Sequence, residues 1–217
     1  MFYKGNIVRC FGNAGYMDQI MDQTNYLSKT IDDFRNFIKG GNTEETLNIS
    51  SVLNQTFSIV NPALQSNYIT IIKDIDVIMA MKGYENELMQ AFINIINNAK
   101  DVLVANENLE NKYIFIDVKQ IDNQCEIIIK DNGGGIMISI INRIFEPYFT
   151  TKHKSRGTGL GLSMAYKIVT EMHNGTIIAS NVTYEYNGEK YTGACFTMTF
   201  NSPFSFMKEL SASSQLV

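Results

Sequence analysis

The sequence is poor in cysteine, lacks a long apolar run and has no excess of positive charge. Its three cysteines, Cys10, Cys125 and Cys195, lie far apart and form no C-x-x-C pair. This spacing argues against a zinc site or a disulfide framework and is typical of a reducing compartment. No stretch approaches the roughly 18 to 20 apolar residues that cross a bilayer. We therefore expect a soluble, cytoplasmic fragment, and a membrane anchor elsewhere in a longer protein would not conflict with this.

The formal net charge of the 217 residues is −4. A chain with this balance has no general attraction to nucleic acid or to an anionic membrane, so nucleic acid is not an expected partner. Any bound polyanion would need a local site. Because 45% of the residues are hydrophobic, the chain can bury one core and carry an additional element.

We divide the chain into an unassigned lead-in at 1–15, a helix at 16–41, one domain at 42–207 and a tail at 208–217. The helix is predicted from a heptad seam that ends at Gly40 and Gly41. A seam favours a partner helix, and thus a homodimer through 17–38, although an amphipathic helix packed on its own domain is the alternative. The seam positions are Met17, Ile20, Thr24, Leu27, Ile31, Phe34 and Ile38.

Hydrophobic periodicity predicts the elements of the domain. They are a helix within 45–60 that Asn61-Pro62 ends, a strand at 67–75, a long helix at 85–104, a hairpin of strands at 112–121 and 124–131, a helix after residue 161, and strands at 176–181 and 193–200. This order predicts an α+β fold, a two-layer α/β sandwich in which helices cover one face of a mixed sheet.

Amide side chains interrupt the apolar pattern of the long helix. Asn94 and Asn98 lie one turn apart on one face, and Asp101 follows at the next step. Carboxamide oxygens are ligands that Mg²⁺ accepts beside phosphate oxygens and water. A solvated helix face explains the same pattern equally well, so the amides alone do not decide between the two.

The second hairpin strand ends on Asp131 and runs directly into three glycines. A carboxylate at the mouth of a strand can accept a hydrogen bond from an exocyclic amine. Gly133 and Gly135 would let the main chain approach a flat ring, which a Cβ would obstruct. A plain strand-to-turn connection explains Asp-Asn-Gly but not the glycine run.

A third feature is "GTGLGL" at 157–162, a loop that leads into a helix. Its main-chain amides would suit phosphate, although glycines of this spacing occur in many tight loops. The preceding loop interleaves aromatic residues with the cations Lys152, His153, Lys154 and Arg156, which favours a lid over the phosphates.

Together, "NIINNAKD" (94–101), "DNGGG" (131–135), "FEPYFTTK" (145–152) and "GTGLGL" (157–162) resemble, in order, the N, G1, F and G2 boxes of sensor histidine kinases. The resemblance covers roughly residues 43–200. It implies the Bergerat ATP-binding fold that is also found in gyrase, Hsp90 and MutL. Residues 17–39 resemble the second helix of the kinase dimerisation hairpin.

The resemblance implies that ATP and Mg²⁺ are the cofactors. Asp131 would bind the adenine amino group, and Asn98, with Asn94 nearby, would hold the metal against the phosphates. Some relatives have a basic residue where this chain has Asp101, so either Lys100 or a lid cation replaces it or the phosphate has one fewer positive contact. The complete nucleotide site implied is Asn94, Asn98, Asp101, Asp131, Gly133, Gly135, Ile136, Phe145, Lys152, Gly157, Thr158, Gly159, Leu160, Gly161 and Leu162.

Histidine is scarce, which matters because a histidine kinase phosphorylates a histidine in a His-Glu-x-x-x-Pro segment. Neither His153 nor His173 matches such a segment, and Asn174-Gly175 after His173 resembles a helix C-cap. We therefore expect the catalytic part of a protein-histidine kinase that does not phosphorylate itself. Its partners would be a hairpin with the acceptor histidine and a response regulator receiver domain. A Bergerat-fold ATPase and a non-catalytic ATP-sensing module are the alternatives.

Overall fold

The computed structural model describes residues 24, 43–75, 79–152, 157–201 and 204–205. Residues 43–146 and 161–205 belong to one compact unit, and residues 147–160 belong to a second. The predicted lead-in, most of the predicted helix at 16–41 and the predicted tail lie outside the described residues. Thr24 is the exception, and it is helical.

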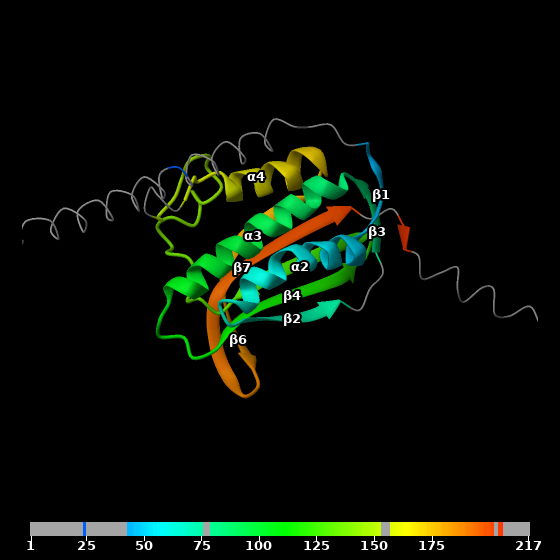
Figure 1. Ribbon diagram of the computed structural model, residues 1–217. Helices are drawn as coiled ribbons and strands as arrows, with labels where there is room; N and C mark the ends of the chain where they lie inside the picture. Colours follow the sequence, from blue (N-terminus) through cyan, green and yellow to red (C-terminus); the bar gives the residue numbers. More distant parts are fainter. Residues whose placement is uncertain (1–23, 25–42, 76–78, 153–156, 202–203, 206–217) are drawn as a thin grey trace, which may run out of the picture. The chain divides into compact units, whose positions relative to one another are not determined.

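The described part of the larger unit contains strands, three α-helices and one π-helical turn (Figure 1). In chain order its elements are β1 (Glu45–Asn48), α2 (Ile49–Gln65), β2 (Ile69–Ile75), β3 (Met79–Gly83), α3 (Glu85–Ala105), β4 (Lys112–Ile121), β5 (Gln124–Asp131), α4 (Gly161–Lys167), the π-helical turn η1 (Ile168–Met172), β6 (Thr176–Tyr186), β7 (Glu189–Asn201) and β8 (Phe204–Ser205).

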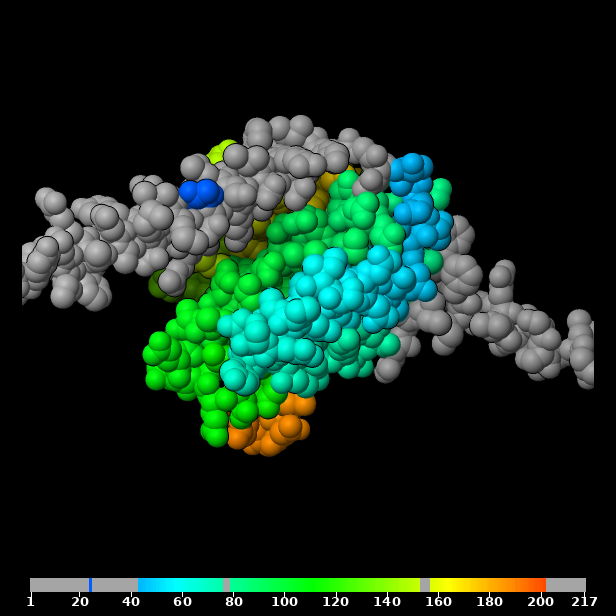
Figure 2. All heavy atoms as spheres, in the orientation of Figure 1, coloured from blue at the N-terminus to red at the C-terminus, as the bar shows by residue number. Residues whose placement is uncertain are grey.

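The main sheet has five strands in the order β2-β4-β5-β7-β6. The β2–β4 pair is parallel and the other pairs are antiparallel, so the sheet is mixed as predicted. Figure 1 shows α2, α3 and α4 over one face of this sheet. In Figure 2 the atoms of α2 and α3 cover that face, and the tip of the β6–β7 hairpin, in orange, emerges beyond them. The α+β two-layer prediction is confirmed.

A second sheet, β1-β3-β8, was not predicted. Its antiparallel β1–β3 pair joins Glu45 to Gly83 and Asn48 to Ala80. The helix predicted to begin near Glu45 therefore begins at Ile49, where the Asn48 side chain accepts a hydrogen bond from the Ser51 amide at 3.2 Å. Leu47, which lies within the range of the predicted helix, belongs to β1 and is buried.

The predicted end of α2 at Asn61-Pro62 was wrong, because the helix continues to Gln65. Proline removes one main-chain donor from a helix interior. Here Leu64 is buried in the core, and the Asn67 side chain donates to the carbonyl of Ala63 at 2.8 Å. Burial of one leucine stabilises by about 1.5 to 3 kcal/mol, which offsets much of the roughly 3 kcal/mol that a proline in a helix interior costs.

Helix α3 and the β4–β5 hairpin follow the sequence prediction closely. The apolar face of α3 is buried, and the hairpin turns at Asp122, whose φ of 53° is left-handed. The predicted strands at 176–181 and 193–200 are parts of the longer β6 and β7. These strands meet at Asn187-Gly188, where both residues have positive φ, as a two-residue hairpin turn requires. None of the helices in the described ranges is both long and apolar enough to cross a membrane.

Candidate nucleotide site

Helix α3 is the element against which the other site segments pack in the larger unit. Its middle turn carries Asn94, and a Cβ on Gly161, the first residue of α4, would lie 3.7 Å from the Asn94 Oδ1. Toward the C-terminus of α3, a Cβ on Gly133 would lie 2.5 Å from the Val102 side chain. The segments that begin at Asp131 and at Gly161 therefore approach the same helix.

The half-buried Asn94 side chain has one satisfied end and one unsatisfied end. Its Oδ1 accepts a hydrogen bond from Gln90 Nε2 at 3.1 Å. Its Nδ2 is buried and has no hydrogen-bond partner among the described residues. An unpartnered buried polar atom costs about 1 to 3 kcal/mol. A half-turn of the amide would place an oxygen at that position, which is where a ligand or a cation could be met.

The other two polar residues predicted on this helix are also half-buried. Asn98 lies one turn after Asn94 on the same face. Asp101 Oδ1 lies 3.6 Å from Lys100 Nζ, so the negative charge has a cation of its own. The described residues contain no group of three or more His, Cys, Asp or Glu that could hold a metal. Carboxamide oxygens such as those of Asn94 and Asn98 are ligands that Mg²⁺ accepts beside phosphate oxygens and water, so these residues fit an ion shared with a nucleotide.

Asp131 ends β5 with its side chain directed toward the helix-covered face of the sheet. Burial alternates along the strand, and Ile127, Ile129 and Asp131 share the buried side. The carboxylate is 2% exposed. Its Oδ1 accepts hydrogen bonds from the amides of Gly133 at 2.8 Å and Ala194 at 3.3 Å. Among the described residues both of these amides donate to Oδ1, and a carboxylate can also accept hydrogen bonds through its second oxygen.

Two opposing influences act on the pKa of Asp131. Burial raises the pKa above its usual value, because a charged carboxylate loses hydration in the interior. The amides of Gly133 and Ala194 oppose this shift by stabilising the carboxylate. A ligand that donates a hydrogen bond to the second oxygen would add to their effect.

Gly193 on β7 lets the neighbouring strand approach this aspartate. An added Cβ would lie 1.5 Å from the Asp131 main-chain oxygen and 2.9 Å from its Oδ1. Any larger residue must displace the main chain on which the carboxylate is mounted. Sequence reasoning missed Gly193, because a glycine at the start of a strand-like run signals equally well a turn or a bulge.

The remainder of the glycine-rich segment is tied to the hairpins on either side. The buried Asn132 side chain accepts a hydrogen bond from the Tyr113 amide and donates one to the Asn111 carbonyl, both at 2.8 Å. Asn181 on β6 accepts from the Ile136 amide and donates to the Ile136 carbonyl, both at 2.7 Å. Asn132 and Asn181 were not predicted, since partners so far apart along the chain leave no local signal.

Gly133 and Gly135 are the two glycines predicted to approach a ligand, and an added Cβ on either would also lie close to protein atoms. Gly135 has a φ of 88°, and a Cβ there would lie 2.6 Å from the Asn181 Oδ1. A left-handed φ and this close contact both require glycine. Packing therefore explains part of the glycine run, because the main chain after Asp131 must pass close to α3 and β6.

Phe145 belongs to the larger unit, where it packs against two aromatic rings. Its ring centroid lies 5.4 Å from that of Tyr166 on α4 and 6.3 Å from that of Phe196 on β7. Leu162 lies in the first turn of α4. The predicted Phe145 thus joins α4 to the sheet, a packing role that does not depend on a nucleotide.

The other predicted residues lie in the second unit, at 147–160. Within it the Tyr148 amide donates to the Gly159 carbonyl at 3.0 Å, so the ends of the loop meet. The Leu160 amide donates to Thr158 Oγ1 at 3.3 Å. A Cβ on Gly157 would lie 3.1 Å from the Lys152 side chain. The lid cations at 153–156 lie outside the described residues.

His173 is a buried structural residue, as the sequence suggested. The Tyr84 amide donates to its Nε2 at 3.0 Å, and its Nδ1 lies 2.8 Å from the Ile168 carbonyl. These contacts require a neutral ring with the proton on Nδ1. Burial lowers the pKa of His173, which favours the same form. The left-handed Asn174, with φ 50°, ends the helical segment.

Comparison with known proteins agrees with this geometry. Residues 83–203, more than half of the chain, match the family described as "Histidine kinase-, DNA gyrase B-, and HSP90-like ATPase". The two-component sensor PprA of Pseudomonas aeruginosa is 38% identical over 105 residues, or 48% of this chain and 11% of PprA. Sporulation kinase E of Bacillus subtilis is 34% identical over 139 residues, or 63% of this chain and 18% of that kinase. The chain spans less than a fifth of either relative.

Solved structures give the same fold. The catalytic domain of histidine kinase ThkA aligns at 22% identity with a TM-score of 0.61, over 74% of this chain and 96% of that domain. Histidine kinase ThkA in complex with response regulator protein TrrA aligns at 17% identity with a TM-score of 0.66, over 93% of this chain and 53% of the other. This protein belongs to the histidine kinase-, DNA gyrase B- and HSP90-like ATPase family, and it contains an ATP-binding domain homologous to those of sensor histidine kinases.

Proposed function

We propose that this chain binds MgATP and transfers the γ-phosphoryl group to a histidine of a helical hairpin, as the catalytic part of a two-component sensor kinase. The observation that carries the proposal is the buried Asp131 carboxylate, whose Oδ1 is held by two main-chain amides. The adenine 6-amino group is a donor of the required kind. Two relatives of this chain are named as a two-component sensor and a sporulation kinase.

In this proposal, the larger unit recognises the base and holds the metal. Asp131 accepts the hydrogen bond of the base, and Gly133, Gly135 and Ile136 border the ring. The carboxamides of Asn94 and Asn98 contribute oxygens to Mg²⁺, which would bridge and neutralise the phosphates when bound. Asp101 lies close to this charge, and Lys100 offsets it locally.

By the resemblance, the proposed phosphate contacts come from residues 152–162. Gly157, Gly159 and Gly161 would border the triphosphate, Thr158 and Leu160 lie between them in the sequence, and Leu162 lies in the first turn of α4. Lys152 contributes a positive charge. Phosphoryl transfer needs mainly positioning and charge neutralisation, and donors of these kinds provide both.

The acceptor would be a histidine of a separate hairpin, because neither His153 nor His173 lies in a segment like that of the acceptor. His173 is unsuitable, because it is buried and both ring nitrogens already have main-chain partners. In the proposed step, an imidazole nitrogen attacks the γ-phosphorus and the bond to the β–γ bridging oxygen breaks. ADP leaves with that electron pair, and the imidazole releases a proton. A response regulator of the kind that ThkA binds would then take the phosphoryl group.

The test combines this chain with γ-labelled MgATP and a separately produced hairpin from a related sensor kinase. We expect label on the hairpin that is lost in acid and retained in base, as phosphohistidine chemistry requires. A matched reaction with the hairpin histidine replaced by glutamine should give no label.

Two other outcomes would contradict the proposal. Bound nucleotide without labelled hairpin would indicate an ATP-sensing module. Steady release of phosphate without the hairpin, faster than about one per minute, would indicate an ATPase, since enzymes commonly turn over above about one per second. The family places the water-activating glutamate of its ATPases where this chain has Asn94, so we expect slow hydrolysis.

A further inference from the structure

The β6–β7 hairpin supports the DNGGGI segment at both ends. At residue 131 the Tyr184 hydroxyl donates to the Asp131 main-chain carbonyl at 3.0 Å. In the middle the Gly134 amide donates to the Thr192 carbonyl at 3.0 Å. At residue 136 Asn181 forms two hydrogen bonds to the main chain. Tyr184 and Asn181 both belong to β6, which is not a neighbour of β5 in the sheet.

Tyr184 reaches Asp131 from the face of the sheet opposite to the helices. The Asp131 carboxylate lies on the same side of β5 as the buried Ile127 and Ile129, while Lys130 points the other way. The Tyr184 ring lies on the side of Lys130, whose Nζ is 5.1 Å from the ring centroid. The Asp131 carboxylate and the Tyr184 side chain therefore lie on opposite faces of the sheet.

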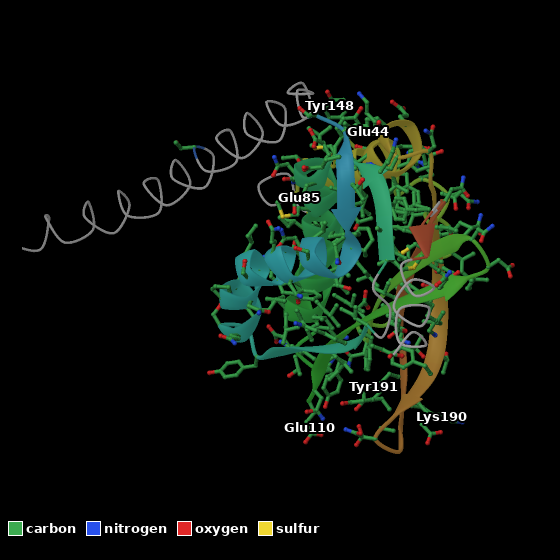
Figure 3. The ribbon with its side chains drawn as sticks, turned by 90° about the vertical axis from the view of Figure 1, so that its right-hand side faces the viewer. Glu44, Glu85, Glu110, Tyr148, Lys190 and Tyr191 are labelled. Carbon is green, nitrogen blue, oxygen red and sulfur yellow. The ribbon has the colours of Figure 1, made fainter. Side chains whose placement is uncertain are left out.

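Aromatic packing fixes the direction of the Tyr184 hydroxyl. The ring meets Phe115 edge-on with centroids 5.0 Å apart, and it lies 6.1 Å from the ring of Tyr191. Figure 3 shows Tyr191 and Lys190 near the end of the hairpin, in the same region as Glu110. Tyr186 continues the cluster, with its centroid 5.1 Å from that of Phe115. Phe115 is 5% exposed, so the cluster is a small core on the outer face.

The hydroxyl remains a donor at neutral pH. Burial raises the pKa of Tyr184 above its usual value, and the nearby Asp131 raises it further. Because residue 193 is glycine, no Cβ lies against the Asp131 carbonyl, and the Tyr184 hydroxyl has room to bond to it.

We propose that Tyr184 is a positioning residue for adenine recognition: its hydroxyl fixes the Asp131 main chain from the outer face, so that the carboxylate meets the 6-amino group of the base. This inference rests on the proposed function of Asp131. It adds a specificity residue on the far side of the sheet, which no motif of the sequence indicated. Tyr184 does not touch the ligand and acts through Asp131.

The test is Tyr184→Phe in the full chain, with calorimetric affinities for MgATP and for the magnesium complex of purine riboside triphosphate, which lacks the 6-amino group. The substitution keeps the ring and removes only the hydroxyl. We expect MgATP to bind about two- to tenfold more weakly, the loss of one ordinary hydrogen bond. The affinity for the purine analogue should not change, so the preference of the protein for adenine falls by the same factor.

Tyr186→Phe is the matched control, because Tyr186 lies two residues further along the same strand, in the same cluster, with no hydroxyl contact to Asp131. It should leave both affinities unchanged. If Tyr184→Phe weakens both nucleotides equally, or neither, Tyr184 has only a packing role and the inference is wrong. If the wild-type protein itself does not prefer ATP over the purine analogue, the proposed function of Asp131 fails instead.

Discussion

Replacement of Asp131 by asparagine separates recognition of the base from folding more cleanly than any other substitution at the site. The Gly133 and Ala194 amides both donate to Oδ1. An asparagine that places its carbonyl oxygen there keeps both bonds. Its NH₂ group then occupies the position of Oδ2, where it meets the 6-amino group of the base, so two donors face each other.

The expected loss of binding is that of one hydrogen bond to a charged group, about 1.5 to 3 kcal/mol. This corresponds to roughly a ten- to hundredfold weaker Kd for MgATP. The fold should not suffer. Because burial raises the pKa of Asp131, the ionised carboxylate has an unfavourable desolvation cost in the folded state, and a neutral amide does not have that cost. Asp131→Asn should therefore unfold at the same temperature as the wild type or above it.

The assay is titration calorimetry with MgATP and with the purine analogue, together with thermal unfolding of the nucleotide-free protein. Asp131→Asn should lose affinity for MgATP and keep its affinity for the analogue. Asp131→Ala is the second informative variant, because it also leaves the two amides without an acceptor. It should lower the free energy of unfolding by about 1 to 3 kcal/mol for each amide. An unchanged MgATP affinity in Asp131→Asn, with the fold intact, would refute the reasoning.

Three further predictions concern the metal, the strand contact and the buried histidine. Asn98→Ala should weaken nucleotide binding with Mg²⁺ more than without it, and equal losses in calorimetry would remove Asn98 from the metal site. Gly193→Ala should displace the Asp131 main chain and reduce both the unfolding temperature and ATP affinity; unchanged values would show that the strands can separate freely. Because burial lowers the pKa of His173, stability should be complete above the unfolded pKa of about 6.5 and fall as pH drops below it, by up to about 1.4 kcal/mol per pH unit. His173→Gln should remove this dependence in denaturant titrations at pH 5.5 and 7.5, and an identical slope in both proteins would contradict the neutral ring.

The elements that the sequence predicted well are those whose signals are local. Helix α3 and the β4–β5 hairpin have regular apolar periods, and Asp122-Asn123 marks the turn between the strands. Strand β1 was misread as the start of α2, because its four residues are too few to show a period and only pairing with β3 makes them a strand. The prediction that α2 ends at Pro62 was wrong because the burial of Leu64 is a tertiary effect, which the local sequence does not show.

The candidate site divides in the same way. Residues with a motif, such as Asp131 and Asn94, could be named from the chain alone. Residues that hold the motif in place could not, because Tyr184 and Asn181 act across 53 and 45 positions of sequence. Hydrogen bonds of this kind depend on which strands become neighbours, and a single sequence carries no local record of that.

The most direct measurement is a crystal structure of this chain with a non-hydrolysable ATP analogue and Mg²⁺. The account predicts the adenine 6-amino nitrogen within about 2.7 to 3.2 Å of a carboxylate oxygen of Asp131, with the glycine-rich main chain along the edge of the ring. A base bound elsewhere, or bound here with its amino group turned to another residue, would contradict it.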